Sequence, residues 1–158
     1  MLRKGVTFSE LIIVFGMILI LMAFISLRVT PTQRRTSLSE IEATLASDIR
    51  QQQLKSMNGT SPSGSGSPFG IYFNADNYVL FRGAAYNPSD VENYVVDLDP
   101  GFSFTTVGFP GSVVVFARGS GEISGFMSDS YDLTLSDEQE GTSRIITVNR
   151  YGAITQIN

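Results

Sequence analysis

The chain has 158 residues, which is room for one domain of ordinary size with a short appendage. It carries 11 Lys and Arg against 15 Asp and Glu, and the net charge of −4 disfavours broad affinity for nucleic acids. It contains no histidine and no cysteine. These absences exclude histidine-based acid–base catalysis, serine–histidine and cysteine–histidine nucleophiles, zinc fingers, iron–sulfur clusters and disulfides.

The first feature along the chain is an uncharged run of 17 residues, Leu11–Leu27. As a helix it rises about 26 Å, slightly less than the roughly 30 Å hydrocarbon core of a bilayer. Including Val6–Ser9, at the cost of including Glu10, gives 22 residues and enough length to cross. The pattern predicts a transmembrane helix over residues 6–27, against the alternative of a buried helix in a soluble fold. No small-residue cleavage site precedes Arg28, which disfavours a removable secretory signal.

The residues around the start of this run carry a resemblance to a known family. The segment Arg3–Ile12 reads RKGVTFSELI and resembles the class III signal of type IV pilins and of type II secretion pseudopilins. The resemblance implies that a prepilin peptidase removes a leader of residues 1–5 by cutting after Gly5, and that the new first residue, Val6, is N-methylated. It makes Glu10 the fifth residue of the mature chain, where the family has a glutamate at the head of an apolar helix. Val6 is a departure, because the family usually has phenylalanine there.

The chemistry of this cut gives Glu10 a partner. Cleavage leaves an α-amino cation on Val6, and in a bundle of packed helices the Glu10 carboxylate of one subunit can meet the Val6 amine of its neighbour. In low-dielectric surroundings this pairing relieves two isolated charges. We therefore expect Glu10 to direct the registered assembly of subunits, a role taken partly from the resemblance.

Charge alone does not orient the predicted membrane segment, because Arg3, Lys4 and the initiating amine on one side are balanced by three arginines over residues 28–35 on the other. The resemblance implies a bacterial inner-membrane protein that crosses once. Its N-terminus would lie in the cytoplasm and residues 28–158 outside, and it would enter a filament after cleavage.

Beyond the apolar run the helix is expected to continue over residues 28–57 as an amphipathic segment, interrupted near Pro31. Packing of this segment against a sheet is predicted by an apolar stripe at helical spacing, formed by Leu38, Ile41, Leu45 and Ile49. Asn58 and Gly59 are typical of a helix end. Residues 58–68 are rich in glycine, serine and proline and are predicted to form a loop.

From Phe69 onward the pattern changes to strands, and residues 69–158 are predicted to form a β-rich globular head. The strands 69–73 and 78–81 are separated by a short polar turn and form a predicted hairpin. Six more strands are expected at residues 94–98, 102–107, 112–117, 131–135, 144–148 and 153–157. No helical crossover separates them, which favours an antiparallel sheet. The expected fold class is α+β and pilin-like, with a long N-terminal helix, half transmembrane and half amphipathic, packed on an antiparallel β-sheet head.

Two parts of the head resemble the GspH/FimT branch of minor pseudopilins and minor pilins. One is the helix end Leu45–Gly59, which leads through its loop into the first strand. The other is Val113–Gly125 together with the closing hairpin, where Asn149 and Gly152 match the Asn–x–x–Gly turn of that branch.

The head offers little for catalysis. Residues 56–158 contain eleven acids and four arginines, and no nucleotide-binding or hydrolase motif. No spacing selects a carboxylate pair for glycoside hydrolysis from the acids in or beside turns, which are Asp97, Asp99, Asp129, Asp132, Asp137, Glu138 and Glu140. We therefore expect that the protein is not an enzyme.

No cofactor is expected, although calcium in the head stays open. Asp97, Asp99 and the stretch Asp129–Glu140 offer oxygen ligands, and some relatives hold calcium in the head, but neither stretch fits the EF-hand pattern. DNA is taken up by some FimT-like pilins with a basic C-terminus. Here that region offers only Arg144 and Arg150 among many acids, which makes nucleic acid an unfavourable partner.

The sequence therefore predicts a minor pseudopilin of a type II secretion system, processed by prepilin peptidase and assembled into a periplasmic pseudopilus for protein export. The expected partners are other pilin-like subunits in a helical filament, the prepilin peptidase and the inner-membrane assembly platform. Two alternatives are kept. One is a minor pilin of a type IV pilus that acts in adhesion, motility or DNA uptake, and the other is a membrane-anchored binding module or hydrolase that does not polymerise.

Overall fold

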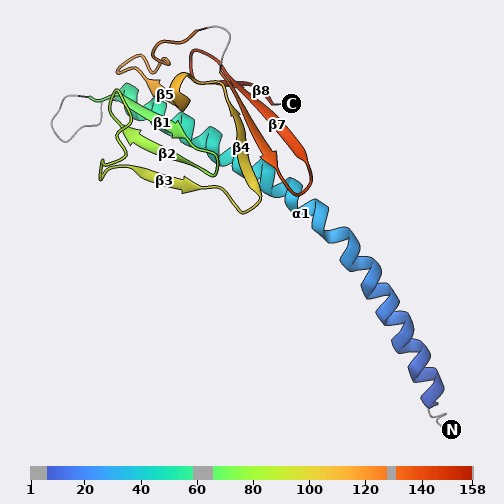
Figure 1. Ribbon diagram of the computed structural model, residues 1–158. Coiled ribbons are helices and arrows are strands. Elements are labelled where there is room, and N and C mark those ends of the chain that lie inside the picture. The colour runs from blue at the N-terminus through green and yellow to red at the C-terminus, as the bar shows by residue number, and fades with distance from the viewer. Residues whose placement is uncertain (1–6, 59–65, 128–130, 158) are drawn as a thin grey trace. The chain divides into compact units, whose positions relative to one another are not determined.

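The computed structural model describes residues 7–58, 66–127 and 131–157, without the side chains at 23–37, 156 and 157. The chain divides into two compact units, Met1–Glu40 and Ile41–Asn158. The helix α1 (Phe8–Asn58) contributes to both units, and all the strands belong to the second (Figure 1).

Helix α1 begins where Thr7 caps its first turn. The backbone N–H of Glu10 donates to the carbonyl oxygen of Thr7 at 3.1 Å and lies 3.4 Å from the Thr7 hydroxyl. A hydroxyl at this position satisfies an N–H group for which the helix itself has no acceptor. The helix runs through Pro31, and the predicted interruption there is wrong. A proline removes one backbone hydrogen bond, a loss that a helix of 51 residues accommodates.

The first unit contains the apolar stretch of α1. Its large side chains are exposed all around the helix, from 45% at Ile18 to 80% at Phe8. The apolar stretch with described side chains, residues 8–22, rises about 22 Å against roughly 30 Å of hydrocarbon. Within residues 7–58, 66–127 and 131–157, no helix combines the length and the apolar character needed to cross a membrane. This finding overturns the predicted transmembrane helix over residues 6–27 and the single-pass inner-membrane localisation.

The second unit contains eight strands in two antiparallel sheets. Sheet A has the order β3-β2-β1-β5, and sheet B has the order β4-β6-β7-β8. The strands of sheet A are β1 (Phe69–Phe73), β2 (Asn77–Arg82), β3 (Tyr94–Asp97) and β5 (Val113–Phe116). The strands of sheet B are β4 (Phe102–Val107), β6 (Asp132–Asp137), β7 (Thr142–Val148) and β8 (Ile154–Ile157). A short 3-10 turn, η1 (Pro110–Ser112), precedes β5.

The expected fold class, a partly transmembrane helix packed on one antiparallel sheet, is wrong. The described head is mostly β, and its strands are divided between two sheets. The division arises because β4 pairs with β6 instead of with its chain neighbour β3, while β5 returns to the edge of sheet A beside β1. The predicted hairpin of β1 and β2 is confirmed, with Phe69 opposite Arg82 and Phe73 opposite Tyr78.

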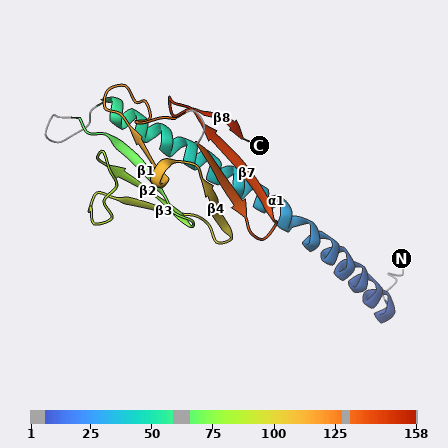
Figure 2. The same ribbon diagram turned by 45° about the horizontal axis from the view of Figure 1, so that its top comes forward.

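Within the second unit, residues 41–58 of α1 lie against both sheets (Figures 1 and 2). Leu45 and Ile49 of the predicted stripe are buried, and the buried line continues through Gln52 and Ser56 at the same helical spacing. The Ser56 hydroxyl accepts a hydrogen bond from the first N–H of β1, on Phe69, at 2.9 Å. Ser56, at the polar end of the stripe, therefore holds the first residue of β1 against the helix.

Aromatic side chains fill the space between the two sheets. The ring of Phe73 on β1 meets Phe104 on β4 edge-to-face at 5.6 Å and stacks on Phe109 at 5.2 Å between centroids. Tyr78 on β2 lies edge-on to the same Phe104 ring, at 6.4 Å. These are favourable aromatic geometries, and they join strands that share no ladder of hydrogen bonds.

Candidate functional site

The predicted processing residues lie at the start of the chain. Gly5 and Val6 fall outside the described residues. Glu10 lies exposed in the first turn of α1, where an acid is favourable beside the positive end of the helix dipole. Within the part of the chain that the structure describes, no hydrogen bond or ion pair engages the Glu10 carboxylate.

Three of the acids that the sequence offered as candidates hold the local structure of sheet B. Asp137 is buried, and its Oδ1 accepts the backbone N–H groups two and three residues further on, at 2.8 and 3.2 Å. Ser103 donates its hydroxyl to Glu138 at 2.9 Å, and Thr147 donates its hydroxyl to Asp132 at 2.7 Å. These carboxylates are acceptors within turns and ladders, which is a structural role.

The other calcium candidates are not gathered into a cluster. Asp97 and Asp99 lie exposed at the end of β3, and Asp129 lies outside the described residues. Among the residues placed by the structure, no three acidic side chains are arranged to hold a metal ion. Calcium binding stays a prediction.

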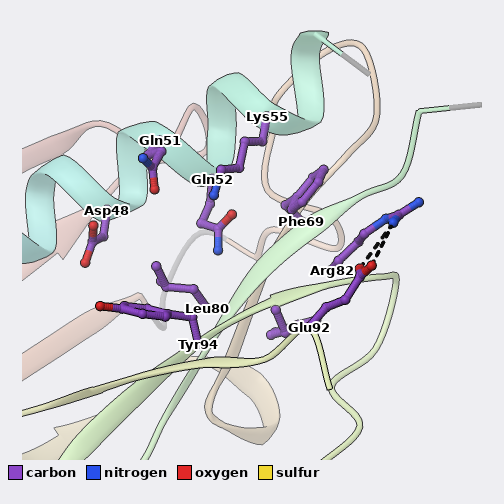
Figure 3. Close-up of a pocket in the computed structure, with 10 residues that line it drawn as sticks. Asp48, Gln51, Gln52, Lys55, Phe69, Leu80, Arg82, Glu92 and Tyr94 are labelled. Carbon is purple, nitrogen blue, oxygen red and sulfur yellow. Dashed lines mark hydrogen bonds and ion pairs between the residues drawn. The ribbon is translucent and has the colours of Figure 1, made fainter. Parts of the chain in front are cut away.

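A groove of about 390 Å³ opens between α1 and sheet A, within the second unit (Figure 3). One wall is a single face of α1, made by side chains at helical spacing: Asp48, Gln51, Gln52 and Lys55. The facing wall comes from the strands and includes Phe69, Leu80 and Tyr94. Register explains this wall, since Leu80 lies opposite Tyr94 and side chains on paired residues share a face of a sheet.

Charged side chains close one end of this groove. Arg82 and Glu92 form an ion pair at 3.2 Å, and Figure 3 shows both side chains at the strand side of the opening. The Lys55 ammonium lies 6.0 Å from the centre of the Phe69 ring, within cation–π range. The groove thus combines an apolar wall with cations and anions at its rim.

Tyr78 joins sheet A to the helix through Asp48, a residue that lines the groove. Its hydroxyl donates a hydrogen bond of 2.6 Å to Oδ2 of Asp48. Burial raises the pKa of Tyr78, and the hydrogen bond and the negative charge of Asp48 raise it further. The hydroxyl therefore stays protonated and acts as a hydrogen-bond donor to Asp48 in the native protein.

Gln52 is the polar side chain of the groove that is left unsatisfied. It is 2% exposed, and no described residue donates to its Oε1. Figure 3 shows its side chain extending from α1 toward Leu80 on the facing wall. A buried amide oxygen without a donor is costly in a folded protein and calls for a reason.

A second buried acid, Glu42, lies on α1 outside the groove. Its Oε2 accepts a hydrogen bond from Arg144 on β7 at 3.1 Å, while Oε1 has no partner among the described residues. Burial raises the pKa of Glu42, and the charge and hydrogen bond of Arg144 oppose that rise. The pair joins α1 to sheet B as Tyr78 joins α1 to sheet A.

Sequence reasoning did not find the groove. Asp48 and Tyr78 are 30 residues apart, and Glu42 and Arg144 are 102 apart, so no local spacing links them. One signal was present in the sequence. Gln52 continues the apolar stripe at helical spacing, so a polar residue occupies a position that faces the core.

Comparisons with protein-family models, with curated proteins and with solved structures find no match for this chain.

Proposed function

We propose that the chain is a minor pseudopilin of a type II secretion system, cut after Gly5 by prepilin peptidase and assembled with other pilin-like subunits into a filament for protein export. The proposal is mechanical: the N-terminal part of α1 packs in the filament, and the β-rich unit presents a binding surface. It takes its processing step from the resemblance of Arg3–Ile12 to a class III signal.

The observation that carries the proposal is the exposed apolar surface of α1 with Glu10 at its head. Every large apolar side chain described between Phe8 and Met22 is exposed. An apolar surface of this extent on a lone subunit is unfavourable in water and marks a site of association. Helices of neighbouring subunits, packed side by side, would cover it.

Glu10 supports the same proposal. Its carboxylate is free of described partners, at the end of the helix where the amine of Val6 would appear after cleavage. In a packed bundle an acid surrounded by apolar side chains needs an opposite charge, and the amine of a neighbouring subunit supplies one. The pairing would fix the register of one subunit against the next.

Site-specific crosslinking tests the proposal. A photoreactive amino acid at Ile13, which is 62% exposed, is expected to crosslink to other pilin-like subunits in cells of the source organism. Glu10→Ala should abolish these crosslinks, since it removes the charge that sets the register. Glu40→Ala removes an exposed acid from the same helix outside the apolar stretch and should leave the crosslinks intact. Crosslinks that persist in Glu10→Ala would refute the assigned role of Glu10, and their absence from the wild-type chain would refute assembly.

A further inference from the structure

The strand β3 leaves one side of sheet A open. It is the end strand of the order β3-β2-β1-β5, and within the described ranges no strand pairs with its outer side. The backbone N–H of Leu98 donates to the carbonyl of Asp76 on the β2 side, at 2.9 Å. Because the direction of backbone groups alternates along an antiparallel strand, Val96 and Tyr94 also point toward β2. Val95 and Asp97 therefore present their N–H and C=O groups to the open side.

This edge is short and carries one charged residue, Asp97, but it lacks lysine, proline and a bulge, which are other features by which proteins protect a free strand. Natural edges are blunted by lysine, proline, a bulge or a covering loop. Tyr94–Asp97 contains no lysine and no proline, and its pairing with β2 is regular. Tyr94 and Val95 are 66% and 52% exposed. A partly apolar edge without lysine, proline or a bulge is a template for one more strand.

The groove lies beside this edge, on the face of sheet A that α1 covers. Tyr94 belongs to both, because it is a residue of β3 and also lines the groove. In a strand added next to β3, the residues beside Tyr94 and Val96 would point to the same face, over the groove. The opposite wall is the face of α1 that carries Asp48, Gln51, Gln52 and Lys55 (Figure 3). The edge and the groove thus offer backbone pairing and a pocket for alternate side chains.

The charge around β3 indicates which kind of segment can bind at this edge. Four acids surround β3, namely Asp90, Glu92, Asp97 and Asp99, and no lysine or arginine occurs between Arg82 and Arg118. Arg82 and Glu92 neutralise each other, so the excess negative charge around β3 comes from Asp90, Asp97 and Asp99. A second copy of β3 would bring its own acids against these, which is unfavourable. Lysine or arginine at the flanks of an incoming segment would be attracted instead.

We propose that the β3 edge and its adjoining groove bind an extended, basic-flanked peptide segment of a partner protein, which adds a strand to sheet A and places an apolar side chain over the groove. Such strand addition obtains affinity from main-chain hydrogen bonds and specificity from pockets for alternate side chains. The proposal does not rest on filament assembly, because it concerns only residues of the second unit.

The probe is a capped peptide in which threonine alternates with valine and phenylalanine, with two lysines at each end. Binding to the purified full-length chain, with its leader intact, is followed by amide hydrogen exchange. The exchange of the Val95 and Asp97 amides is expected to slow on titration, and a peptide of the same core with glutamates at its ends should bind about tenfold more weakly or worse. Failure of processing in cells would leave this result unchanged, so the two proposals are tested separately.

Two variants sharpen the test. Val95→Pro removes an outward N–H that the β2 ladder does not use. It should weaken binding of the lysine-ended peptide by about tenfold or more, whereas Val95→Thr should bind this peptide normally. Should Val95→Pro unfold the chain, Asp97→Lys with Asp99→Lys keeps the β3 backbone and should reverse the preference toward the glutamate-ended peptide. Unchanged exchange at Val95, equal binding of both peptides, or dimerisation of the chain through this edge would each overturn the proposal.

Discussion

At the scale of single residues, the polar positions on the buried face of α1 decide how the helix meets the sheets. Glu42 and Gln52 occupy places where helical spacing calls for apolar side chains. Each leaves one oxygen without a described partner, which lowers stability relative to a fully satisfied core. Arg144 compensates Glu42 in part, because it supplies both a hydrogen bond and a positive charge.

Glu42→Gln is expected to keep or raise the free energy of unfolding at pH 7. The pKa of Glu42 is raised above its ordinary value of 4.5, chiefly by burial. The folded chain therefore holds this proton to higher pH than the unfolded chain, and the stabilisation that results is complete below pH 4.5 and lost as the pH rises through the raised pKa. As the pH rises from 4 to 8, the free energy of unfolding measured in urea should fall less in Glu42→Gln than in the wild type. A variant that is less stable than the wild type at pH 7 would contradict this account of Glu42.

Arg144→Leu provides the contrasting change. It leaves the Glu42 carboxylate buried without an opposite charge and should cost about 1–3 kcal/mol, less than a fully buried pair because Arg144 is 37% exposed. The double variant with Glu42→Gln should recover most of that loss. A double-variant cost equal to the sum of the two single-variant effects would show that the two side chains act independently.

Gly152 is the residue where the closing hairpin meets the core. Its φ is +69°, and a Cβ there would lie 2.7 Å from Cε1 of Phe116, a fully buried ring. Gly152→Ala should therefore cost about 2–4 kcal/mol of stability, from backbone strain and from the steric clash together. Gly119→Ala is the matched control, since its φ is +79° and a Cβ there meets nothing within 4 Å, so it should cost about 1 kcal/mol. If Gly152→Ala and Gly119→Ala lower the free energy of unfolding in urea by similar amounts, the contact with Phe116 is unimportant.

At the scale of elements, a hydrogen bond from Tyr78 on β2 to Asp48 connects α1 with sheet A. Tyr78→Phe removes the donor to Asp48 and is expected to lower the free energy of unfolding at pH 7 by about 1–2 kcal/mol. The pKa of Tyr78 is raised above its ordinary value of 10, mainly by burial. Its contribution is therefore complete below pH 10 and falls away as the pH rises further, when the unfolded chain releases the proton first.

Alkaline unfolding measures this contribution. The difference in stability between the wild type and Tyr78→Phe should narrow above pH 10 and stay constant below it. Asp48→Asn serves as the partner variant, because it keeps an acceptor for the hydroxyl and removes the charge. A difference between wild type and Tyr78→Phe that does not change with pH would contradict burial of an intact tyrosine hydroxyl at this position.

The strands illustrate what the sequence could and could not predict at this scale. The β1–β2 hairpin was predictable, because two alternating apolar runs flank a four-residue polar turn and the pairing is local. The burial of Leu45 and Ile49 in the α1 stripe was predictable for the same reason of short-range periodicity. The contacts of Asp48 with Tyr78 and of Glu42 with Arg144 were not, because they depend on which faces the tertiary fold brings together.

At the scale of the whole molecule, the assignment of strands to sheets was the feature that the sequence did not reveal. The absence of helical crossovers between the predicted strands favoured one antiparallel sheet. In the structure β4 leaves β3 and pairs with β6, and aromatic packing around Phe73 and Phe104 joins the two sheets instead. Strand lengths and turns do not encode such non-local pairing. The length of the apolar helix was likewise overestimated as a membrane span.

Processing at Gly5 is the central claim, because the proposed assembly depends on the amine that it creates at Val6. The most direct test is the N-terminus of the full-length chain produced together with an active prepilin peptidase, determined by intact mass and terminal peptide sequencing. The account predicts a chain that begins at Val6, with or without an N-methyl group, and an uncut chain when Gly5→Leu blocks the site. A chain that keeps residues 1–5 while a known prepilin in the same cells is cut would contradict the account.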